Sequence, residues 1–587
     1  MNLNDNRRSN ATRARRPFSW IRFTALALLL SLAAQGRPAQ AGAIVVGRGA
    51  DCTVPSIQAA IERANGFGGY NLILVTDDVA NGVYPENLLL QNLREDLVLE
   101  LVGGYADCTT LAPTAFGKAS IYGGVFNRPT LRLRGHVNAT FRGFWMESGT
   151  GEDRFGGGGI DFRGNGRLVL ENVRVAESNA LDPFGAGIHV EGQNGVALLE
   201  LVGGVEVTDQ SATGITAKGS SHLQIKGAGN AIRNNAGSGI ALTAPAFAHI
   251  GAVGALIHDN SGPGIVVEGI GEQAFSPTLI YSVDPANPLR ITANGLGALR
   301  FAAYDAPGPT SVCIRNALIE GNGGSTFNAP LNVYGRQAFL HLNPENGDVC
   351  SFPPKADIAC PVDGMCNVIL GNHAGPDLPL ISAARDASVT INRVLLVDNH
   401  ATSLLSTNLG TAASTASITM THSLALYNTL RDNLFEALNG GILDIWDSTV
   451  AGNGGSFSVS LVGSDPTLFQ VTNTIIDQPQ ALIYHSNGPV ETTHLDRVLA
   501  RNRTNAQGSD EVVVGQPEYL DAYGRLAPDS LGVDYAPPGG GTDFDGNPRD
   551  VDTANLPNQH GPRDLGAFES QVATLDVLFA DGFEPLP

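Results

Sequence analysis

The sequence predicts an all-β protein: a right-handed parallel β-helix, a solenoid closed at its N-terminal end by a short capping helix. The first observation behind this prediction is a dipeptide, Gly-Ile, that precedes short apolar runs at intervals of 28, 27, 25 and 25 residues. It occurs at Gly159, Gly187, Gly214, Gly239 and Gly264. The second is an amide side chain four residues before three of these glycines, at Gln210, Asn235 and Asn260. A fixed offset inside a fixed period indicates a repeat architecture.

The length of the repeat unit is the third observation. The unit is too short for a strand-helix-strand crossover, which needs roughly thirty or more residues. Its apolar runs, such as 168–170 and 265–267, are short and end in Gly, Asn and Ser clusters, as strands do. A coil of about 25 residues with two or three strands stacks on the next coil about 4.8 Å away. Neither a leucine-rich frame nor a hexapeptide period appears, which argues against the two main alternatives.

The repeated amides and glycines have separate physical roles in this prediction. Asn tolerates left-handed backbone geometry at a turn, and stacked amides can hydrogen-bond along the solenoid axis. The glycine four residues later lets the chain enter the next strand without a Cβ clash. Before Gly187 the corresponding amide, Asn179, stands eight residues back, which predicts an insertion at 181–184.

Residues 1–41 are predicted to be a signal peptide. An Arg-rich region runs to Arg22, an apolar core follows at 23–34, and Ala39-Gln40-Ala41 forms a small-x-small cleavage site. The apolar core is too short to span a bilayer comfortably, and no later segment has the length of a transmembrane span. We therefore expect an exported protein, located in the periplasm, at the cell surface or outside the cell of a Gram-negative-type bacterium.

The charge of the exported chain limits its partners. Cleavage after Ala41 removes seven Arg and one Asp, so the net charge goes from −21 to −27. Nucleic acids and anionic membranes need clustered Lys and Arg on the protein, and this chain has only four lysines. The sequence therefore predicts no nucleic-acid partner.

Residues 42–115 are predicted to form the N-terminal cap and the first coils. Strands are expected at 44–47, 72–76 and 97–102, and a short helix at 54–61 with Ser56 as its N-cap. Six cysteines in an exported chain predict disulfides, and Cys52 and Cys108, which bracket this segment, are the first choice among fifteen pairings. The other four cysteines lie between 313 and 366; a zinc site there is the alternative, but the spacing does not fit a zinc knuckle.

Three motifs in this segment carry a family resemblance. They are Ser-Ile-Gln-Ala-Ala-Ile at 56–61, Gly-Val-Tyr-Pro-Glu-Asn at 82–87 and Gly-Gly-Tyr-Ala-Asp-Cys at 103–108. Together they resemble the cap and first coils of secreted bacterial pectin-lyase-like β-helix proteins. The resemblance implies that the helix plugs the open end of the solenoid, which would otherwise expose apolar core and unpaired strand edges.

Residues 116–500 are predicted to form the main β-helix. The amide series resumes at Asn294, Asn322, Asn372, Asn399, Asn428 and Asn453. The step from Asn322 to Asn372 is 50 residues, which fits either two coils or one coil with a loop. The span 343–366 is rich in Pro and Cys and predicts an inserted, disulfide-pinned loop.

Residues 501–570 differ in character from the coils. Thr-Asp-Phe-Asp-Gly-Asn-Pro-Arg at 542–549 and Gly-Pro-Arg-Asp-Leu-Gly-Ala-Phe-Glu at 561–569 closely resemble the choice-of-anchor Q module, which ends many bacterial secreted β-helix proteins. This resemblance implies surface or sorting biology and no particular reaction. Residues 571–587 are predicted to be a short terminal tail.

Three carboxylates in this module are candidate calcium ligands. Asp543, Asp545 and Asp550 supply the hard oxygens that calcium prefers. Gly546 comes too early for a standard calcium loop, so turn formation, with Arg549 pairing locally, is the alternative. No other cofactor is predicted.

The sequence offers no defined catalytic group. It contains no nucleophile elbow, zinc-protease motif or phosphate-binding loop, and none of its lysines stands beside a repeating acidic cluster. Stacked coils bring distant carboxylates together, so a set of acids is a candidate for one glycosidase-like groove, with a solvated outer face as the alternative. These acids are Asp161, Glu191, Glu268, Glu320, Asp398 and Asp444.

Trp446 and Asp444 are a candidate sugar contact. Strand alternation over 442–447 puts both on one face, opposite Leu443 and Ile445. An outward Trp beside a carboxylate can stack on a sugar ring, whereas an inward Trp would fill the core.

Taken together, these observations predict an exported, surface-associated and monomeric β-helix that binds or adheres, with a polysaccharide or another cell-envelope component as partner. The alternative is a polysaccharide lyase or glycoside hydrolase, which the fold alone suggests. Three or more charged groups converging in one groove would favour the enzyme, and a groove of Asn, Ser and Thr only would favour binding.

Overall fold

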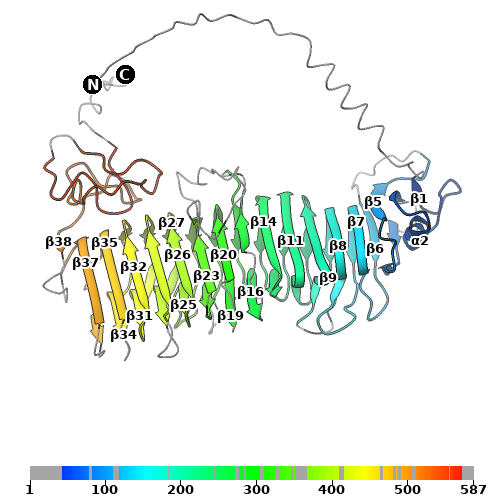
Figure 1. Ribbon diagram of the computed structural model, residues 1–587, viewed down its shortest axis with the longest axis horizontal. Helices are drawn as coiled ribbons and strands as arrows, with labels where there is room; N and C mark the ends of the chain where they lie inside the picture. Colours follow the sequence, from blue (N-terminus) through cyan, green and yellow to red (C-terminus); the bar gives the residue numbers. More distant parts are fainter. Residues whose placement is uncertain are drawn as a thin grey trace, which may run out of the picture.

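The computed structural model describes residues 43–571 apart from interruptions at 78–81, 110–117, 181, 183, 244, 271–276, 283, 285, 305–309, 325–328, 337, 345–349, 351–366, 409–414, 463–466, 480–483, 487–490, 504–510 and 554–555. This part of the chain contains 38 strands and one helix, α2 (Ile57–Phe67). The strands wind into about 13 coils of a parallel β-solenoid (Figure 1). The predicted parallel β-helix is confirmed.

Each coil contributes to three parallel sheets, which we call A, B and C in the order in which they follow one another along a coil. Sheet A contains β1 (Ile44–Val46), β2 (Tyr70–Thr76), β5 (Val98–Tyr105), β14 (Phe247–Val253), β17 (Thr278–Tyr281), β20 (Thr310–Arg315), β23 (Ala338–Leu342), β26 (Ser388–Asn392), β29 (Ser417–Thr421) and β32 (Ile442–Trp446).

Sheet B contains β3 (Val83–Tyr84), β6 (Ala119–Tyr122), β10 (Glu206–Thr208), β12 (Ala231–Arg233), β15 (Leu256–His258), β18 (Leu289–Thr292), β21 (Ala317–Glu320), β24 (Asn367–Leu370), β27 (Val394–Val397), β30 (Leu424–Leu426), β33 (Thr449–Ala451) and β38 (Val512–Val514). Sheet C contains β4 (Leu88–Leu90), β13 (Ile240–Thr243), β16 (Ile265–Ile270), β19 (Leu299–Tyr304), β22 (Leu331–Tyr334), β25 (Ile381–Ala384), β28 (His400–Asn408), β31 (Thr429–Leu438), β34 (Phe457–Val462) and β36 (Tyr484–Ser486).

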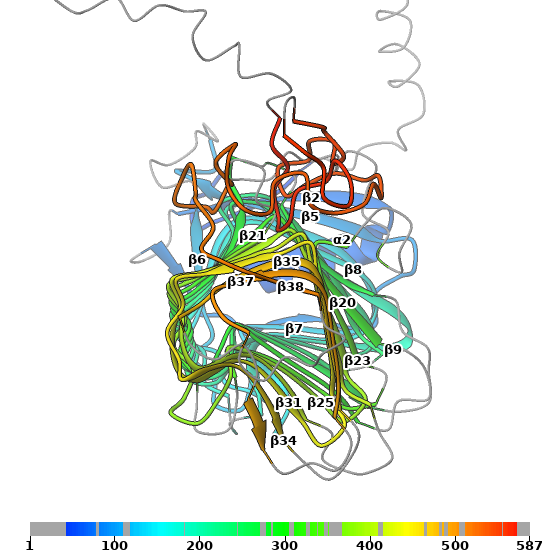
Figure 2. The ribbon, with the colours of Figure 1, turned by 90° about the vertical axis from the view of Figure 1, so that its left-hand side faces the viewer.

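Six longer strands bend at a corner and join two or three of these sheets. β7 (Leu131–Glu147) and β8 (Gly157–Ala176) run through C, A and B; β9 (Ala186–Val202) and β11 (Thr213–Ala228) run through C and A; and β35 (Thr467–Asp477) and β37 (Glu491–Ala500) run through A and B. Seen along the axis, the coils superimpose as a prism with sheet B at the top and sheet C at the bottom (Figure 2).

The interior of the prism is one continuous apolar core that runs from Ile44 to Ala500. It forms because side chains alternate across each strand. In β32, for example, Leu443 and Ile445 point inward and are buried, whereas Asp444 and Trp446 point outward. Equivalent inward residues of successive coils stack on one another, so no coil is stable without its neighbours.

The amides predicted to stack form a continuous ladder at the corner between sheets B and C. Each Nδ2 donates to the Oδ1 of the next amide at 2.7 to 3.0 Å. Each Oδ1 also accepts the backbone N–H of the preceding ladder residue. The members are Asn235, Asn260, Asn294, Asn322, Asn372, Asn399, Asn428 and Asn453, all buried. The ladder is confirmed, and it satisfies polar groups that burial would otherwise penalise.

Two details of the predicted corner are wrong. Ser178, and not Asn179, occupies the ladder position in the coil before Gln210, whose Oε1 accepts the Ser178 N–H at 3.2 Å. The left-handed residue is also not the ladder amide but the residue before it, as at Asp209, Asn234 and Asp259, with φ between 54° and 57°. The exposed neighbour turns the chain, and the ladder amide itself has no positive φ.

The 50-residue step is one coil that carries an insertion. The Nδ2 of Asn322 donates directly to the Oδ1 of Asn372 at 3.0 Å, so these residues belong to adjacent coils. The extra residues lie between β23 and β24, as the inserted loop predicts. Cys350, in this insertion, forms a disulfide with Cys313 on the outer face of sheet A. Cys360 and Cys366 lie outside the described residues.

Helix α2 closes the N-terminal end of the solenoid and buries one face on the first coil. Ser56 is its N-cap and accepts the N–H of Ala59 at 3.2 Å. The carboxylate of Glu86 accepts two further N–H groups, from Ile57 at 3.0 Å and Gln58 at 2.9 Å. The buried face is Ile57, Ala60, Ile61 and Ala64. The helix is longer than the predicted 54–61, because it continues to Phe67 before Gly68 ends it.

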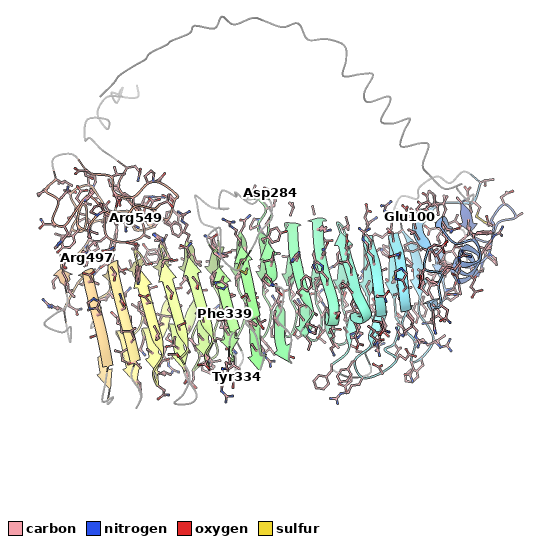
Figure 3. All side chains as sticks on the ribbon, in the orientation of Figure 1. Glu100, Asp284, Tyr334, Phe339, Arg497 and Arg549 are labelled. Atoms are coloured by element: carbon pink, nitrogen blue, oxygen red, sulfur yellow. A yellow bond between two sulfur atoms is a disulfide. The ribbon has the colours of Figure 1, made fainter. Side chains whose placement is uncertain are left out.

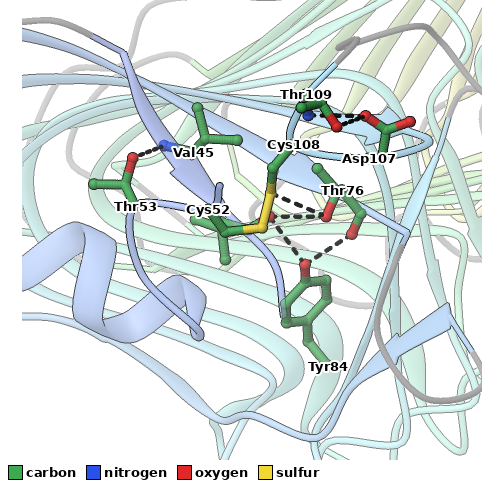
Figure 4. Close-up of a disulfide and its surroundings, with 9 residues drawn as sticks. Val45, Cys52, Thr53, Thr76, Tyr84, Asp107, Cys108 and Thr109 are labelled. Atoms are coloured by element: carbon green, nitrogen blue, oxygen red, sulfur yellow. Dashed lines mark hydrogen bonds between the residues drawn. A yellow bond between two sulfur atoms is a disulfide. The ribbon is translucent and has the colours of Figure 1, made fainter. Parts of the chain in front are cut away.

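The disulfide predicted between Cys52 and Cys108 is confirmed, and it lies beside a buried tyrosine (Figure 4). The hydroxyl of Tyr84 donates to the carbonyl oxygen of Thr76 at 2.7 Å, and Thr76 Oγ1 donates to that of Val46 at 2.9 Å. The motif at 82–87 therefore has a structural role: Tyr84 ties the first coils together and Glu86 caps the helix.

Residues 515–571, which we call the C-terminal segment, pack on the outer face of sheet B over the last coils (Figures 1 and 2). Phe544, Ala567 and Phe568 cover Leu395, Leu424 and Leu426, whose side chains point away from the solenoid core. A second contact joins Leu526 and Leu565 to Ile475 and Leu499. This half of sheet B is therefore apolar on both faces, and the C-terminal segment shields its outer face from water. None of the described elements is a helix of the length and hydropathy that a membrane span requires.

Candidate binding groove on sheet C

The outer face of sheet C carries two rows of side chains that follow the solenoid axis. One row contains Asp161, His189, Thr216, Ala241, Val266 and Arg300, one from each of six successive coils. The other contains Arg163, Glu191, Lys218, Thr243, Glu268 and Ala302. Because each position is fixed by strand register, residues 25 to 34 positions apart become neighbours on adjacent coils.

A groove of about 430 Å³ lies over the middle of these rows. Its floor comes from β11, β13, β16 and β19, and its side wall comes from the turns that lead into β8 and β9. The lining residues are Phe155, Phe184, Thr213, Thr216, Lys218, Ser238, Ala241, Leu242, Thr243, Val266, Glu268 and Arg300.

Two exposed phenylalanines form the side wall of the groove. The rings of Phe155 and Phe184 are 6.4 Å apart, and their residues are 45% and 56% exposed. The guanidinium of Arg154 lies 5.4 Å from the centroid of the first ring and 4.4 Å from that of the second. This cation–π contact holds the two rings side by side as an apolar surface open to solvent.

Lys218 is the central cation of the groove. Its Nζ lies 4.3 Å from the centroid of Phe155. Burial lowers the pKa of Lys218, and Glu191 and Glu268 oppose this effect through their charges. None of the described carboxylates lies within 4.0 Å of this ammonium group, which is the distance of an ion pair. Lys218 has therefore lost water without gaining a direct anionic partner.

Ion pairs flank Lys218 along the axis. On one side, Glu268 and Arg300 pair at 3.6 Å. On the other, Arg163 Nη2 donates to Asp153 Oδ1 at 2.9 Å, and this contact lowers the pKa of Asp153 to about 2. Arg163 Nε also donates to the fully buried Asp161 at 3.1 Å. These pairs place donors and acceptors at fixed positions on both sides of the ammonium.

His189 and Glu191 lie at the N-terminal end of the groove. The buried His189 has Nδ1 2.8 Å from Thr216 Oγ1, and its Nε2 lies 3.7 Å from a carboxylate oxygen of Glu191. The contact with His189 is the main cause that lowers the pKa of Glu191 to about 2, which favours its carboxylate form.

The six candidate acids do not share one groove, as the sequence had suggested they could. Asp161, Glu191 and Glu268 lie on the outer face of sheet C. Glu320 lies on sheet B, Asp398 in the corner after β27, and Asp444 on sheet A. Lys218, which sequence reasoning set aside, stands between Glu191 and Glu268. The sequence pattern already indicated this position: Glu191, Lys218 and Glu268 each lie four residues after a repeated glycine, at Gly187, Gly214 and Gly264.

Trp446 and Asp444 lie together on the outer face of sheet A. Trp446 is 42% exposed, and its indole Nε1 donates to Asp444 Oδ1. Thr421 and Thr472 flank the indole on the neighbouring coils. The core-filling alternative is therefore wrong, because strand alternation directs this Trp outward. Burial raises the pKa of Asp444. The sugar contact itself stays a prediction.

The three candidate calcium ligands accept hydrogen bonds from separate partners. Asp543 accepts the N–H of Asn547 at 2.8 Å, Asp545 accepts from Arg525 Nη2 at 2.7 Å, and Asp550 accepts the N–H of Gly540 at 2.7 Å. Within the described part of the chain, no three His, Cys, Asp or Glu side chains are grouped as metal ligands would be. These contacts fix turns, and the calcium site stays a prediction.

Arg549 does not pair only locally, as the turn alternative held. Its guanidinium is buried 3.7 Å from Asp447 of the β-helix and 3.8 Å from Glu569, and Figure 3 shows it in the C-terminal segment, above the solenoid. No protein-family model matches this chain, and no curated protein matches its sequence. The fold and the groove on sheet C are therefore what supports a function.

Proposed function

We propose that this protein is an exported β-helix that binds an acidic polysaccharide in the groove on sheet C. The observation that carries the proposal is the half-buried Lys218, placed between an exposed phenyl wall and a row of hydroxyl and ionic groups. Ligand sites of this kind combine apolar surface with a few fixed polar groups.

Each part of the groove matches one part of a sugar. The rings of Phe155 and Phe184 are flat apolar surfaces on which the C–H face of a pyranose can pack. Thr216 and Thr243 supply hydroxyl groups, and the pair of Glu268 and Arg300 supplies acceptors and donors for sugar hydroxyls. A carboxylate or sulfate on the sugar would give Lys218 the anionic partner that burial has made valuable.

Other features support an exported and surface-associated location. The N-terminal 41 residues have the pattern of a signal peptide, and the two disulfides fit an oxidising compartment. The motifs at 542–569 resemble a surface or sorting module. The extended lateral faces of the solenoid then serve as a scaffold that presents the groove.

A second candidate function is a polysaccharide lyase acting at the same groove, and the three charged groups that line the groove, Lys218, Glu268 and Arg300, favour it. The specific observation is that Lys218 is partly desolvated, which lowers its pKa and raises the fraction present as the neutral amine, the form that can accept a proton. It would take the proton from the carbon beside the sugar carboxylate; the released electron pair would form a carbon–carbon double bond as the glycosidic oxygen leaves and takes up a proton from water.

The test is a calorimetric titration of the purified protein with acidic and neutral polysaccharides, with ultraviolet detection of unsaturated products. We expect binding of the acidic class and its loss in Lys218→Met. Lys226→Met is the matched control, because Lys226 is a half-exposed lysine on sheet A. Failure of every acidic polysaccharide to bind would overturn the proposal. Unsaturated product that disappears in Lys218→Met would establish the lyase.

A further inference from the structure

Three exposed phenylalanines recur once per coil beside the groove. Phe126, Phe155 and Phe184 are separated by 29 and 29 residues. They stand five, five and four residues before Leu131, Ile160 and Ile188, which share one position in sheet C. Each therefore lies in the turn between sheets B and C, in three successive coils.

Phe126 is not part of the groove lining, and it is 75% exposed, more than any other large apolar residue in the described chain. Tyr122, at the end of β6, and Val125, in the same turn as Phe126, are 44% and 49% exposed. Neighbouring apolar side chains left in water mark an interaction surface on a soluble domain. The turn of Phe126 is thus the next wall element in line with Phe155 and Phe184.

The groove lining continues in the opposite direction, also one coil at a time. After the three phenylalanine turns come Lys218 on β11, Thr243 on β13, Glu268 on β16 and Arg300 on β19. The line of residues from Phe126 to Arg300 crosses seven successive coils. Six steps of about 4.8 Å make it about 29 Å long.

We propose that the ligand is a linear polysaccharide that lies parallel to the solenoid axis, with about one sugar per coil and its far end on Phe126. This inference rests on the proposed function and adds the direction, the length and the outer end of the site. The coil spacing of about 4.8 Å is close to the length of one pyranose in an extended chain. A chain lying along the strands would meet only the outward residues of one coil and would leave Phe126 unused.

The experiment uses oligosaccharides of one acidic polysaccharide, from two to about ten sugars, against the full chain. We expect the affinity to rise with length up to about seven sugars, the number of coils in the line, and then to level off. Phe184→Ala should weaken binding at every length by about three- to tenfold. Phe126→Ala should weaken only the longer oligosaccharides by a similar factor and leave the shortest unchanged.

Phe67→Ala is the matched control, since Phe67, the last residue of the capping helix α2, is 54% exposed beside Arg63. It should change no affinity, and unchanged unfolding midpoints show that all three variants are folded. An affinity that levels off at two or three sugars, or a Phe126→Ala variant that binds the long oligosaccharides normally while Phe184→Ala does not, overturns the axial placement and leaves the proposed function standing. Absence of binding by the unmodified protein at every length overturns both.

Discussion

The carboxylate of Asp447, at the corner between sheets A and B, lies 3.7 Å from the buried guanidinium of Arg549 in the C-terminal segment. The same carboxylate lies 3.5 Å from Arg563 Nη1 and 3.6 Å from His422 Nε2. One β-helix residue is therefore the ionic centre of the contact between the two parts of the chain. The apolar contacts around Phe544 and Leu565 exclude water from it.

Removing one partner of this buried pair should destabilise the docking of the C-terminal segment. Asp447→Asn leaves two guanidinium groups without their shared anion, which we expect to cost about 3 kcal/mol. The measurements are the unfolding midpoint and the rate of proteolytic cleavage within 515–571. Arg431→Met is the control, because Arg431 forms exposed pairs with Asp377 and Asp432 and should change stability by less than about 1 kcal/mol. Equal effects of the two substitutions would contradict the assignment.

The same contact should weaken in acid because of His422. Burial is the main cause that lowers its pKa from 6.5 to about 4, opposed by Asp447 and reinforced by Arg549, Arg393 and Arg563. Between pH 6.5 and 4 the unfolded chain binds a proton that the folded chain does not, so stability falls as the pH falls through this window, by on the order of 2 kcal/mol.

The titration of Glu569 changes the stability with pH in the opposite direction to that of His422. The test therefore compares the unmodified chain with a His422 variant. Burial raises the pKa of Glu569 from 4.5 to about 8. Its contribution to the stability of the folded chain is therefore fully present below pH 4.5 and is lost as the pH rises through 8. We therefore expect the unfolding midpoint of His422→Gln to lose less between pH 7 and 4 than that of the unmodified chain. Parallel pH profiles for the two proteins would show that His422 is not the titrating group.

The amide ladder should be sensitive to the loss of one member. Asn372→Ala removes the acceptor of Asn322 Nδ2 and the donor to Asn399 Oδ1, leaving buried polar groups unpaired. The expected cost is about 2 to 3 kcal/mol, measured as a lower unfolding midpoint in urea. Asn558→Ala, at an exposed position of the C-terminal segment, should leave the midpoint unchanged.

Binding in the groove should depend on the charge of Lys218. Because burial lowers the pKa of Lys218, its ammonium group loses its charge at a lower pH than an exposed lysine does. We expect the affinity for an acidic polysaccharide to fall as the pH is raised from 7 to about 10. Lys218→Met should bind weakly at both pH values, with no such trend. An affinity that is constant with pH in the unmodified protein would argue against Lys218 as the anion contact.

Calcium removal tests the remaining sequence prediction. Asp543, Asp545 and Asp550 already accept hydrogen bonds from the protein, so we expect a chelator to leave the unfolding midpoint of the C-terminal segment unchanged. A midpoint that falls with chelator and recovers with added calcium, but not with magnesium, would establish a calcium site at these carboxylates.

The local and periodic features of this protein follow from its amino-acid sequence. The strand alternation that places Trp446 outward, the N-cap at Ser56 and the ladder of Asn235 and its equivalents all follow from short-range rules repeated once per coil. The disulfide between Cys52 and Cys108 could be predicted for a similar reason, because these cysteines bracket a single segment.

The tertiary structure alone decided which coils align and what covers them. Coil lengths vary, so the lateral position of a residue depends on every insertion before it. A change of one residue moves a side chain to the other face of its strand. This is why Ser178, one residue before Asn179, occupies the ladder position. Glu320 and Asp398 belong to sheet B and the corner after it, so they do not share the outer face of sheet C with Glu268 and Lys218. The groove joins residues of successive coils, and the contact of Arg549 with Asp447 joins the C-terminal segment to a coil; only coil stacking and the packing of that segment bring these residues together.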